Sequence, residues 1–549
     1  MLSDTKLRDI LSQTKVISEV DLADAVEFAS KEQRPLAEVL VERDLLSDEH
    51  LGQLIAEYTG YHFINLRKVN IADDVLQFIP ETMARSMQVI VCGQTTTAIQ
   101  LAMTNPTDVA TVHLIEKKTG KQAQVFYATA RDIQEALGNY KRGLQFDFSK
   151  LVTTQADTKI VEMLNTIIQY AYMKKASDVH IEPANDVVVV RFRIDGVLHD
   201  MVKLPKHILE TLITRIKILA KLRTDEHRSA QDGKMTQKLE EEDLDIRVSV
   251  LPVAEGEKAV LRLLSSRSRQ YALEDIGFGE QDIVRVRKYL KRPQGMILVT
   301  GPTGSGKTTT LYAFLKILNR REVNISTIED PVEYAITGIN QIQVNSATNL
   351  TFAAGLRSIV RQDPDIIMIG EIRDEETAGI AVNSAMTGHL VLSTLHTNDA
   401  ATTLPRLLDM AVEPYLAAST VNIAVGQRLV RKICSQCLMS ETMSGTALAD
   451  LAKQIDLKRY LKKDVKQLRF YRGRGCASCN HTGYQGRVGV FEVLEMSVTI
   501  RKLIMEQANA DAIKQQAVAE GMTTMFEDGL HKALLGVTTL EEVLRVVAE

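Results

Sequence analysis

A glycine-rich stretch carries the clearest chemical signal in this sequence. It runs Gly301-Pro302-Thr303-Gly304-Ser305-Gly306-Lys307-Thr308 and matches the pattern G-x-x-x-x-G-K-[ST] completely. Glycines at this spacing let backbone N–H groups surround a polyphosphate, while Lys307 reaches the β- and γ-phosphates and the Thr308 hydroxyl holds Mg²⁺. Thr309, the next residue, belongs to the same predicted contact. The sequence therefore predicts a binding site for ATP or GTP with Mg²⁺.

Acidic side chains end the next two apolar segments. The stretch 327–333 closes a short strand with Glu329 and Glu333, and the apolar run 365–371 ends in Glu371. A phosphate-loop enzyme needs acids opposite the loop to hold Mg²⁺ and to polarise the attacking water. These three glutamates are the candidates, although Gly370 occupies the position that usually carries the first acid of the second strand.

Two histidines flank the strand-like run that follows. His389 precedes it and His396 ends it, within the stretch 388–397. A histidine near a strand end is more often structural than functional, but here it accompanies a phosphate loop and three acids. Either residue is therefore a candidate to sense a γ-phosphate or to donate a proton to a neighbouring acid.

Four of the five cysteines form two C-x-x-C pairs. The pairs are Cys434 with Cys437 and Cys476 with Cys479, and 38 residues separate them. In an intracellular chain two such pairs favour a tetrahedral thiolate zinc site, and a redox dithiol is the alternative. The fifth, Cys92, lies in an apolar strand-like run and is interpreted as a small buried hydrophobic residue.

Composition excludes several classes of protein. The chain has 549 residues, 45% of them apolar and 25% charged, which predicts about three or four globular domains. Neither a signal segment nor a run of 18 apolar residues is found, so a cytoplasmic protein is expected. The net charge of −4 argues against a general nucleic-acid binder.

Changes of pattern along the chain predict its domains and an α/β fold class. A 29-residue repeat of apolar positions indicates a pair of helix–turn–helix units near the N-terminus, of the kind used for docking. The predicted parts are a helical repeat at 1–60, a small α/β domain at 61–142, a linker at 143–157, a second α/β domain at 158–270, and a phosphate-loop domain at 278–549 with a cysteine insert at about 430–490 and C-terminal helices.

Strands of the second α/β domain carry arginines. Alternation in 187–194 places Arg191 and Arg193 on one face, and Asp195-Gly196 predicts a hairpin turn to the next strand. Arg247 and Arg262 project from two later strands and have little to pair with locally. Such a face is expected to be solvated or to lie at an interface.

With these motifs in order, the chain resembles the secretion-ATPase superfamily, and specifically its GspE/PilB branch, which powers type II secretion and type IV pilus assembly. The resemblance covers the chain from Thr158 onward. The family's motifs are a Walker A loop, an Asp box, a Walker B strand and a His box, and they match 301–308, 329–333, 365–371 and 388–396. The resemblance implies a RecA-like ATPase core.

The resemblance also implies roles. Glu333 is the expected general base, Glu371 lies on the metal and water side, and His396 lies near the γ-phosphate. The arginines that match phosphate-gripping positions within or across subunits are Arg247, Arg262, Arg361 and Arg373. A homo-hexamer is implied, acting with an inner-membrane platform protein at the cytoplasmic face of that membrane. The cysteine insert separates this branch from the retraction ATPases and favours extension or secretion.

Two further segments, the N-terminal repeat and a basic run, concern possible binding partners. Some relatives bind cyclic di-GMP through a repeated R-L-G-x-x-L pattern, but 6–8 and 35–37 depart from it, and Lys15 and Asp44 replace glycines. Binding of that ligand by the repeat is therefore not expected. A basic run at 458–474 carries eight Lys and Arg residues against one acid. It is either a solvated face or a contact to anionic lipid or an acidic platform protein.

Two other functions fit the phosphate loop. One is a nucleic-acid translocating ATPase, against which the acidic balance counts. The other is a nucleotide-gated scaffold that does not hydrolyse ATP, which would leave the three glutamates without a role. The choice between a pilus and a secretion pseudopilus as the load stays open at this level.

Overall fold

The computed structural model shows a chain of mixed α/β parts, which confirms the predicted fold class. It describes residues 4–14, 16–31, 34–43, 45–69, 71, 73–76, 78–95, 97–137, 157–239, 243–264, 272–444, 467–476, 479 and 481–547. Some predicted features lie outside these residues. They are the linker up to position 156, Lys15, Asp44, and positions 458–466 of the basic run.

The N-terminal repeat forms two pairs of helices, as the 29-residue spacing predicted. The helices are α1 Asp4–Thr14, α2 Glu19–Lys31, α3 Leu36–Glu42 and α4 Asp48–Thr59. Ser18 caps α2, since its Oγ accepts a hydrogen bond from the N–H of Asp21 at 3.1 Å. Ser47 caps α4 in the same way through the N–H of His50 at 3.2 Å.

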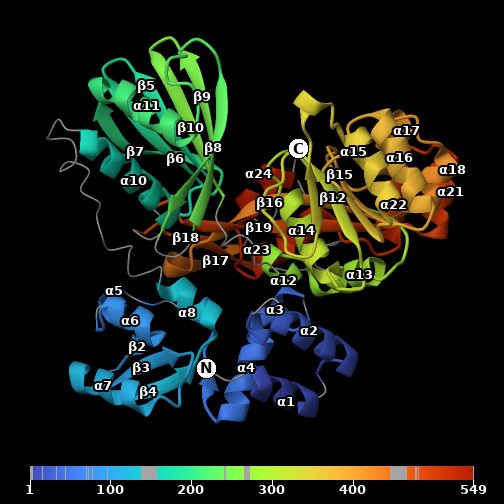
Figure 1. Ribbon diagram of the computed structural model, residues 1–549. Coiled ribbons are helices and arrows are strands. Elements are labelled where there is room, and N and C mark those ends of the chain that lie inside the picture. Colours follow the sequence, from blue (N-terminus) through green and yellow to red (C-terminus); the bar gives the residue numbers. More distant parts are fainter. Residues whose placement is uncertain are drawn as a thin grey trace. The chain divides into compact units, whose positions relative to one another are not determined.

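A small α/β domain follows, shown in blue in Figure 1. Its four-stranded sheet has the order β1-β4-β3-β2. Its elements are β1 His62–Phe63, α5 Asp73–Leu76, α6 Glu81–Met87, β2 Val89–Gln94, β3 Ala98–Met103, α7 Val109–Thr119, β4 Gln122–Tyr127 and α8 Ala130–Leu137. Cys92 is buried in β2, and burial raises the pKa of its thiol to about 11. The interpretation of Cys92 as a buried hydrophobic residue is therefore confirmed.

The second α/β domain is built on a six-stranded antiparallel sheet with the order β7-β6-β5-β10-β9-β8. Its elements are α10 Asp157–Met173, β5 Asp178–Ala184, β6 Val187–Ile194, β7 Val197–Pro205, α11 Leu209–Leu219, β8 Gln231–Lys238, β9 Asp243–Val253 and β10 Gly256–Leu264. The helices α10 and α11 pack on one face of the sheet and form a single apolar core with it. The opposite face carries the polar side chains.

Strand β6 shows why its arginines lie on that polar face. Val188, Val190 and Phe192 are buried under the helices, so the alternate positions Arg191 and Arg193 point the other way. The turn to β7 uses positive φ angles at Asp195 (50°) and Gly196 (85°), as the Asp-Gly pair predicted.

The phosphate-loop domain contains a seven-stranded sheet with the order β13-β12-β14-β15-β11-β16-β19. All neighbouring strands run parallel except β16 and β19. The strands are β11 Gly295–Thr300, β12 Ile325–Glu329, β13 Asn340–Gln343, β14 Ile366–Ile369, β15 Leu390–Leu395, β16 Val421–Ile433 and β19 Tyr484–Glu495.

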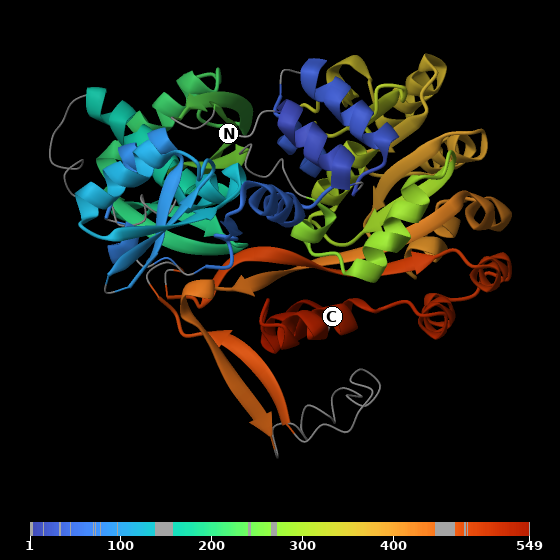
Figure 2. The ribbon, with the colours of Figure 1, turned by 90° about the horizontal axis from the view of Figure 1, so that it is seen from below.

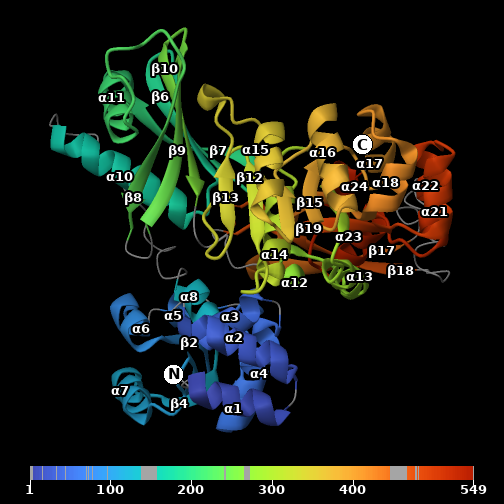
Figure 3. The same cartoon turned by 45° about the vertical axis from the view of Figure 1, so that its right-hand side comes forward.

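Helices cover both faces of this sheet (Figure 3), which explains why its central strands are apolar throughout. One face carries α12 Leu273–Ile276, α13 Glu280–Leu290 and α14 Lys307–Leu318. The other carries α15 Phe352–Ile359, α16 Glu375–Met386, α17 Thr403–Asp409, α18 Pro414–Thr420, α21 Val498–Met505 and α22 Ala510–Ala519. Alternate residues of β11 enter the two cores, with Met296 in one and Ile297 in the other.

The cysteine insert forms a two-stranded arm beside the long strands β16 and β19 (Figure 2). Its strands are β17 Leu438–Ser444 and β18 Gln467–Gly473, and the helices α23 Met525–Leu534 and α24 Leu540–Val547 follow later in the chain. Leu468 and Phe470 pack against Leu530 and Ala533 of α23. The arm is thus anchored to a C-terminal helix by its own small apolar cluster.

Among the described helices, none is both long enough and apolar enough to span a bilayer.

Replacing Leu392 by Ala tests the central layer of the phosphate-loop domain. Leu392 is fully buried in β15 between two paired strands, so the cavity should lower the free energy of unfolding by about 2–5 kcal/mol. Leu535→Ala is the matched control, because Leu535 is 64% exposed and its loss should cost less than about 0.5 kcal/mol. The free energy of unfolding of both variants is measured by hydrogen exchange of the β11 and β15 peptides in the full chain across a urea series. Equal effects of the two changes would contradict this packing.

Candidate functional site

The parallel strands bring several predicted site residues to one edge of the sheet. The phosphate loop follows β11, Glu329 ends β12, Glu371 follows β14 and His396 follows β15. Because these strands are parallel, their carboxyl ends meet at the same edge, where α/β proteins commonly bind ligands. Residues separated by up to 95 positions in the sequence therefore share one site.

Two glycines of the loop are required by its close contact with β16. A Cβ atom on Gly301 would lie 2.4 Å from the carbonyl oxygen of Gln427, and one on Gly306 would lie 2.9 Å from its Nε2. Gly306 also has a φ of 90°, which disfavours other residues. The hydroxyl of Ser305 is buried without a hydrogen-bond partner among the described residues. A tight glycine loop with an unpaired buried donor is a shape that accepts a polyphosphate.

The Lys307 side chain folds back over the phosphate loop. Its Nζ donates to the carbonyl oxygens of Gly301 at 2.8 Å and Pro302 at 3.1 Å. Burial lowers the pKa of Lys307, the nearby Glu371 carboxylate opposes this shift, and Arg428 adds to it. The ammonium group thus faces both an acid and a second cation.

Glu371 lies between an imidazole and a guanidinium group. Its carboxylate lies 3.0 Å from Nε2 of His396 and 2.6 Å from the Arg373 guanidinium. The hydrogen bond that Arg373 donates to Glu371 raises the pKa of Arg373. Glu371 is buried, whereas the His396 and Arg373 side chains are 46% and 66% exposed, so both can meet a ligand from the solvent side. The structure therefore brings these three predicted residues together.

The carboxylate of Glu329 accepts hydrogen bonds from inside the domain. It is 3% exposed and accepts hydrogen bonds from Thr327 Oγ1 at 2.6 Å, from Gln341 Nε2 at 3.1 Å, and from the Tyr312 hydroxyl. Three internal donors thus engage the Glu329 carboxylate, and the alternation of the strand alone does not reveal these partners. The assignment of Glu329 to the nucleotide site stays a prediction.

Glu333 remains nearer to solvent than Glu329. It is half-buried, and its backbone N–H donates to the Tyr312 hydroxyl at 3.2 Å. The loop that carries it starts at the carboxyl end of β12, on the same edge of the sheet as the phosphate loop. Glu333 and Glu371 therefore both belong to this edge, Glu333 half-buried and Glu371 beside His396 and Arg373.

Two residues of β16 complete the site and were not predicted from the sequence. Gln427 is buried, contacts the loop glycines and accepts a hydrogen bond from Thr310 Oγ1 at 2.7 Å. Arg428 is buried close enough to influence Lys307, and its Nη2 donates to the carbonyl oxygen of Asn398 at 3.3 Å. They lie more than a hundred residues after the loop, and only the pairing of β16 with β11 brings them there.

His389 and Arg361 lie at the opposite edge of the sheet. His389 precedes β15, and its Nδ1 lies 2.9 Å from the carbonyl oxygen of Ser384. The length of β15, about 20 Å, separates it from His396. Arg361 follows α15 and precedes β14, and it donates to the carbonyl oxygen of Arg357 at 2.8 Å. Neither residue lies at the phosphate-loop edge of its own chain, and their roles in nucleotide binding stay predictions.

Arg247 and Arg262 are direct cross-strand neighbours on the polar face of the six-stranded sheet. Arg262 also pairs with Asp178 of β5, at 3.0 Å between Nε and Oδ1. The expectation that it has little to pair with locally is therefore wrong, since the neighbouring strand supplies an acid. Lys234 and Arg193 stand in the same row across the sheet. The row thus holds four cationic groups against one acid.

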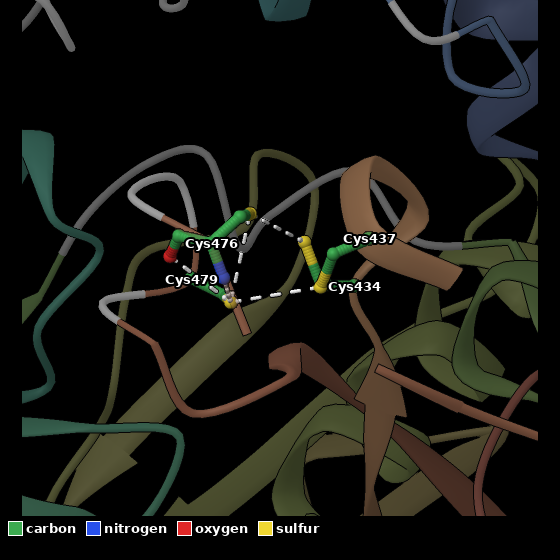
Figure 4. A group of neighbouring side chains, drawn as sticks. All are labelled: Cys434, Cys437, Cys476 and Cys479. Carbon is green, nitrogen blue, oxygen red and sulfur yellow. Dashed lines mark hydrogen bonds between the residues drawn. The ribbon is translucent and has the colours of Figure 1, made fainter. Parts of the chain in front are cut away.

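The four insert cysteines converge on one point (Figure 4). Their sulfur atoms all lie within 4.8 Å of one another, and Sγ of Cys434 lies 3.9 Å from Sγ of Cys476. Four thiolates around one zinc ion, each at about 2.3 Å, would stand about 3.8 Å apart. Burial tends to raise the pKa of Cys479, but backbone N–H groups of Cys476 and Gly483 hydrogen bond to its sulfur and lower its pKa to about 7. The geometry and the N–H···S bonds fit a structural thiolate site.

Family profiles match most of the chain. The profile described as "Type II/IV secretion system protein" matches residues 153–545, and the MshEN domain profile matches residues 59–145. The X-ray structure of the Yersinia pseudotuberculosis ATPase DotB covers 72% of this chain and 94% of its own, with a TM-score of 0.52 and 19% identity. That likeness concerns the fold alone.

Two relatives extend over nearly the whole length. The type IV pilus assembly ATPase PilB of Myxococcus xanthus (strain DK1622) is 37% identical, covering 98% of both chains. The type II secretion system protein E of Xanthomonas campestris pv. campestris is 39% identical, covering 100% of this chain and 99% of the relative. The similarity thus extends further towards the N-terminus than the motifs alone suggested. The chain belongs to the type II/IV secretion system protein family, in the branch of PilB and protein E.

Proposed function

We propose that the protein is a motor ATPase that hydrolyses ATP to drive assembly of a type IV pilus or of a type II secretion pseudopilus. The observation that carries this proposal is the convergence of the phosphate loop, Glu333, Glu371 and His396 at one edge of the sheet. The full-length similarity to a pilus assembly ATPase and to a secretion protein supports the coupling of hydrolysis to assembly. Both relatives are about equally similar, so both loads fit.

Each residue of the site has its own role in hydrolysis. The loop N–H groups, Lys307 and the exposed Thr308 hydroxyl hold the phosphates and the magnesium that accompanies them, which supplies charge neutralisation when bound. Glu333 accepts the proton of the attacking water. Glu371 holds His396 at 3.0 Å, so that the imidazole faces the terminal phosphate. Arg373, which is mostly exposed, adds a positive charge at the same edge.

A ring of subunits, a homo-hexamer, completes this site. The row of Lys234, Arg247, Arg262 and Arg193 presents more positive charge than Asp178 can balance, and an anion brought by another subunit would complete it. Arg361, which does not lie at the phosphate-loop edge of its own chain, is likewise placed to serve a neighbour. Arginines supplied across an interface stabilise phosphoryl transfer in many phosphate-loop enzymes.

The remaining surfaces concern location and partners. We place the ring at the cytoplasmic face of the inner membrane, in contact with a platform protein of the assembly machinery. Zinc held by the four cysteines would fix the arm β17–β18, on which Arg469, Arg472 and Arg474 are exposed. These cations suit an anionic membrane surface or an acidic protein face, at about 1 kcal/mol per charge near lipid. Nucleic acid is not proposed as a partner.

Glu333→Gln should abolish hydrolysis and leave ATP bound. Loss of the general base should lower kcat by about 10²–10⁴-fold, because the amide cannot accept the proton of water. Lys307→Ala, in contrast, should lose ATP binding itself. Steady-state ATPase assays and binding of a fluorescent ATP analogue separate the two effects. Glu322→Gln, an exposed change before β12, is the control and should match the wild type. Turnover by Glu333→Gln within about threefold of wild type, less than 0.7 kcal/mol, would exclude Glu333 as the base.

Cys434→Ser should release zinc from the purified protein. Three remaining thiolates bind the ion more weakly, and the arm should lose protection in hydrogen exchange while the phosphate loop still binds ATP. Cys92→Ser is the matched control, since Cys92 is buried in a different domain. Metal analysis by mass spectrometry gives the zinc content of each protein. A wild-type protein that purifies without zinc, or a Cys434→Ser protein that keeps it, would contradict the site.

Arg262→Ala should lower the ATPase rate at least tenfold, about 1.4 kcal/mol in the barrier, if this arginine serves a neighbouring subunit. Arg223→Ala is the control, because Arg223 is exposed on a loop of the same domain and pairs only with Asp225 among its described salt bridges. Mixing Arg262→Ala with Glu333→Gln should restore part of the activity, since some sites then combine an intact base with an intact arginine. A mixture that stays inactive although both proteins assemble into rings would contradict action across subunits.

A further inference from the structure

One buried hydroxyl connects the two glutamates of the stretch 329–333. Tyr312 lies on α14 and is 1% exposed. Its hydroxyl donates to the Glu329 carboxylate and accepts hydrogen bonds from the Glu333 N–H at 3.2 Å and from Gln341 Nε2 at 3.3 Å. A phenol has one proton to donate and two lone pairs to accept, so these three contacts use its full capacity.

The direction of these hydrogen bonds follows from the groups involved. Glu329 accepts from Thr327 and Gln341 as well, and a carboxylate can only accept. Burial and the adjacent Glu329 carboxylate both raise the pKa of Tyr312, so the phenol keeps its proton. The backbone N–H of Glu333 is a donor by nature. The hydroxyl therefore stands as a fixed bridge between a strand end and the loop that follows it.

The helix that carries Tyr312 also carries the phosphate-binding residues. Thr308 and Tyr312 are four residues apart on α14 and thus lie on the same helix face. The first turn of this rigid helix presents Thr308 and Lys307 to the nucleotide, and the next turn holds the backbone of Glu333. The ring of Tyr312 is itself fixed by an edge contact with Tyr334, with centroids 4.7 Å apart at 78°.

We propose that Tyr312 is a positioning residue for hydrolysis, which sets the distance between the phosphate loop and the Glu333 side chain through its hydrogen bond to the Glu333 backbone. This inference rests on the proposed role of Glu333 as general base. Glu329, in turn, orients the Tyr312 hydroxyl rather than the nucleotide. A small displacement of a catalytic group can cost about a hundredfold in rate, so such a bridge has a measurable consequence.

Tyr312→Phe removes the hydroxyl and keeps the ring. We expect kcat to fall by about ten- to a hundredfold, while the KM for ATP and the affinity for a non-hydrolysable ATP analogue stay within about threefold of wild type. The reason is that Lys307, Thr308 and the loop N–H groups are untouched. Single-turnover hydrolysis with pre-bound ATP should show the loss in the chemical step.

Thr327→Val is the matched control. It also deprives the buried Glu329 carboxylate of one hydroxyl donor, at nearly constant volume, but Thr327 makes no described hydrogen bond to Glu333. If Tyr312 only satisfied Glu329, both variants would lose stability and activity alike. We expect similar shifts in thermal unfolding from the two variants, and a loss of kcat from Tyr312→Phe alone. Equal losses of kcat, or wild-type kcat in Tyr312→Phe, would overturn the inference.

A double-mutant cycle with Glu333→Gln separates positioning from a general defect. If Tyr312 acts through Glu333, adding Tyr312→Phe to Glu333→Gln should change the residual rate by less than about twofold. A further loss as large as in the wild-type background would overturn the inference. Failure of the proposed function is distinguishable, because an active Glu333→Gln protein excludes the base itself. An inactive Glu333→Gln protein together with a fully active Tyr312→Phe protein excludes only the role of Tyr312.

Discussion

The parallel pairing of β12, β14, β15 and β11 is the constraint on which the site depends. At the carboxyl edge Glu329 ends β12, while the phosphate loop, Glu371 and His396 follow β11, β14 and β15, so these residues meet although they lie far apart in the sequence. The strands can be parallel because helices cover both faces of the sheet. The apolar strands that pack between the helices therefore also gather the polar residues at one edge of the sheet.

Hydrogen bonding then distinguishes two of the acids. Glu329 and Glu371 are both buried, and they lie at the carboxyl ends of strands of the same sheet. Glu329 is surrounded by hydroxyl and amide donors, whereas Glu371 lies beside the His396 imidazole and the Arg373 guanidinium. A carboxylate with neutral internal donors holds the fold together, while one that contacts exposed side chains can exchange partners when a ligand arrives. Similar residues at similar positions thus acquire different roles.

Hydrogen bonds and strand register also determine the arrangement of the cysteine cluster and of the six-stranded sheet. The cysteines are held at a spacing set by backbone N–H···S bonds and by the turn that joins β16 to the arm, which makes the cluster ready for a tetrahedral ion. On the six-stranded sheet, strand register gathers cations into a row with a single acid.

The sequence by itself determined the features that depend on short-range chemistry. The phosphate loop, the two cysteine pairs, the Asp195-Gly196 turn and the helical repeat all rest on residues close together in the chain, and their spacing is enough to identify them. Tertiary structure alone decided that Gln427 and Arg428 join the loop, that His389 lies at the opposite end of β15 from His396, and that Tyr312 connects Glu329 to Glu333. The physical reason is that strand order and register decide which residues meet. The distance between two residues along the chain does not show which strands pair or in which register.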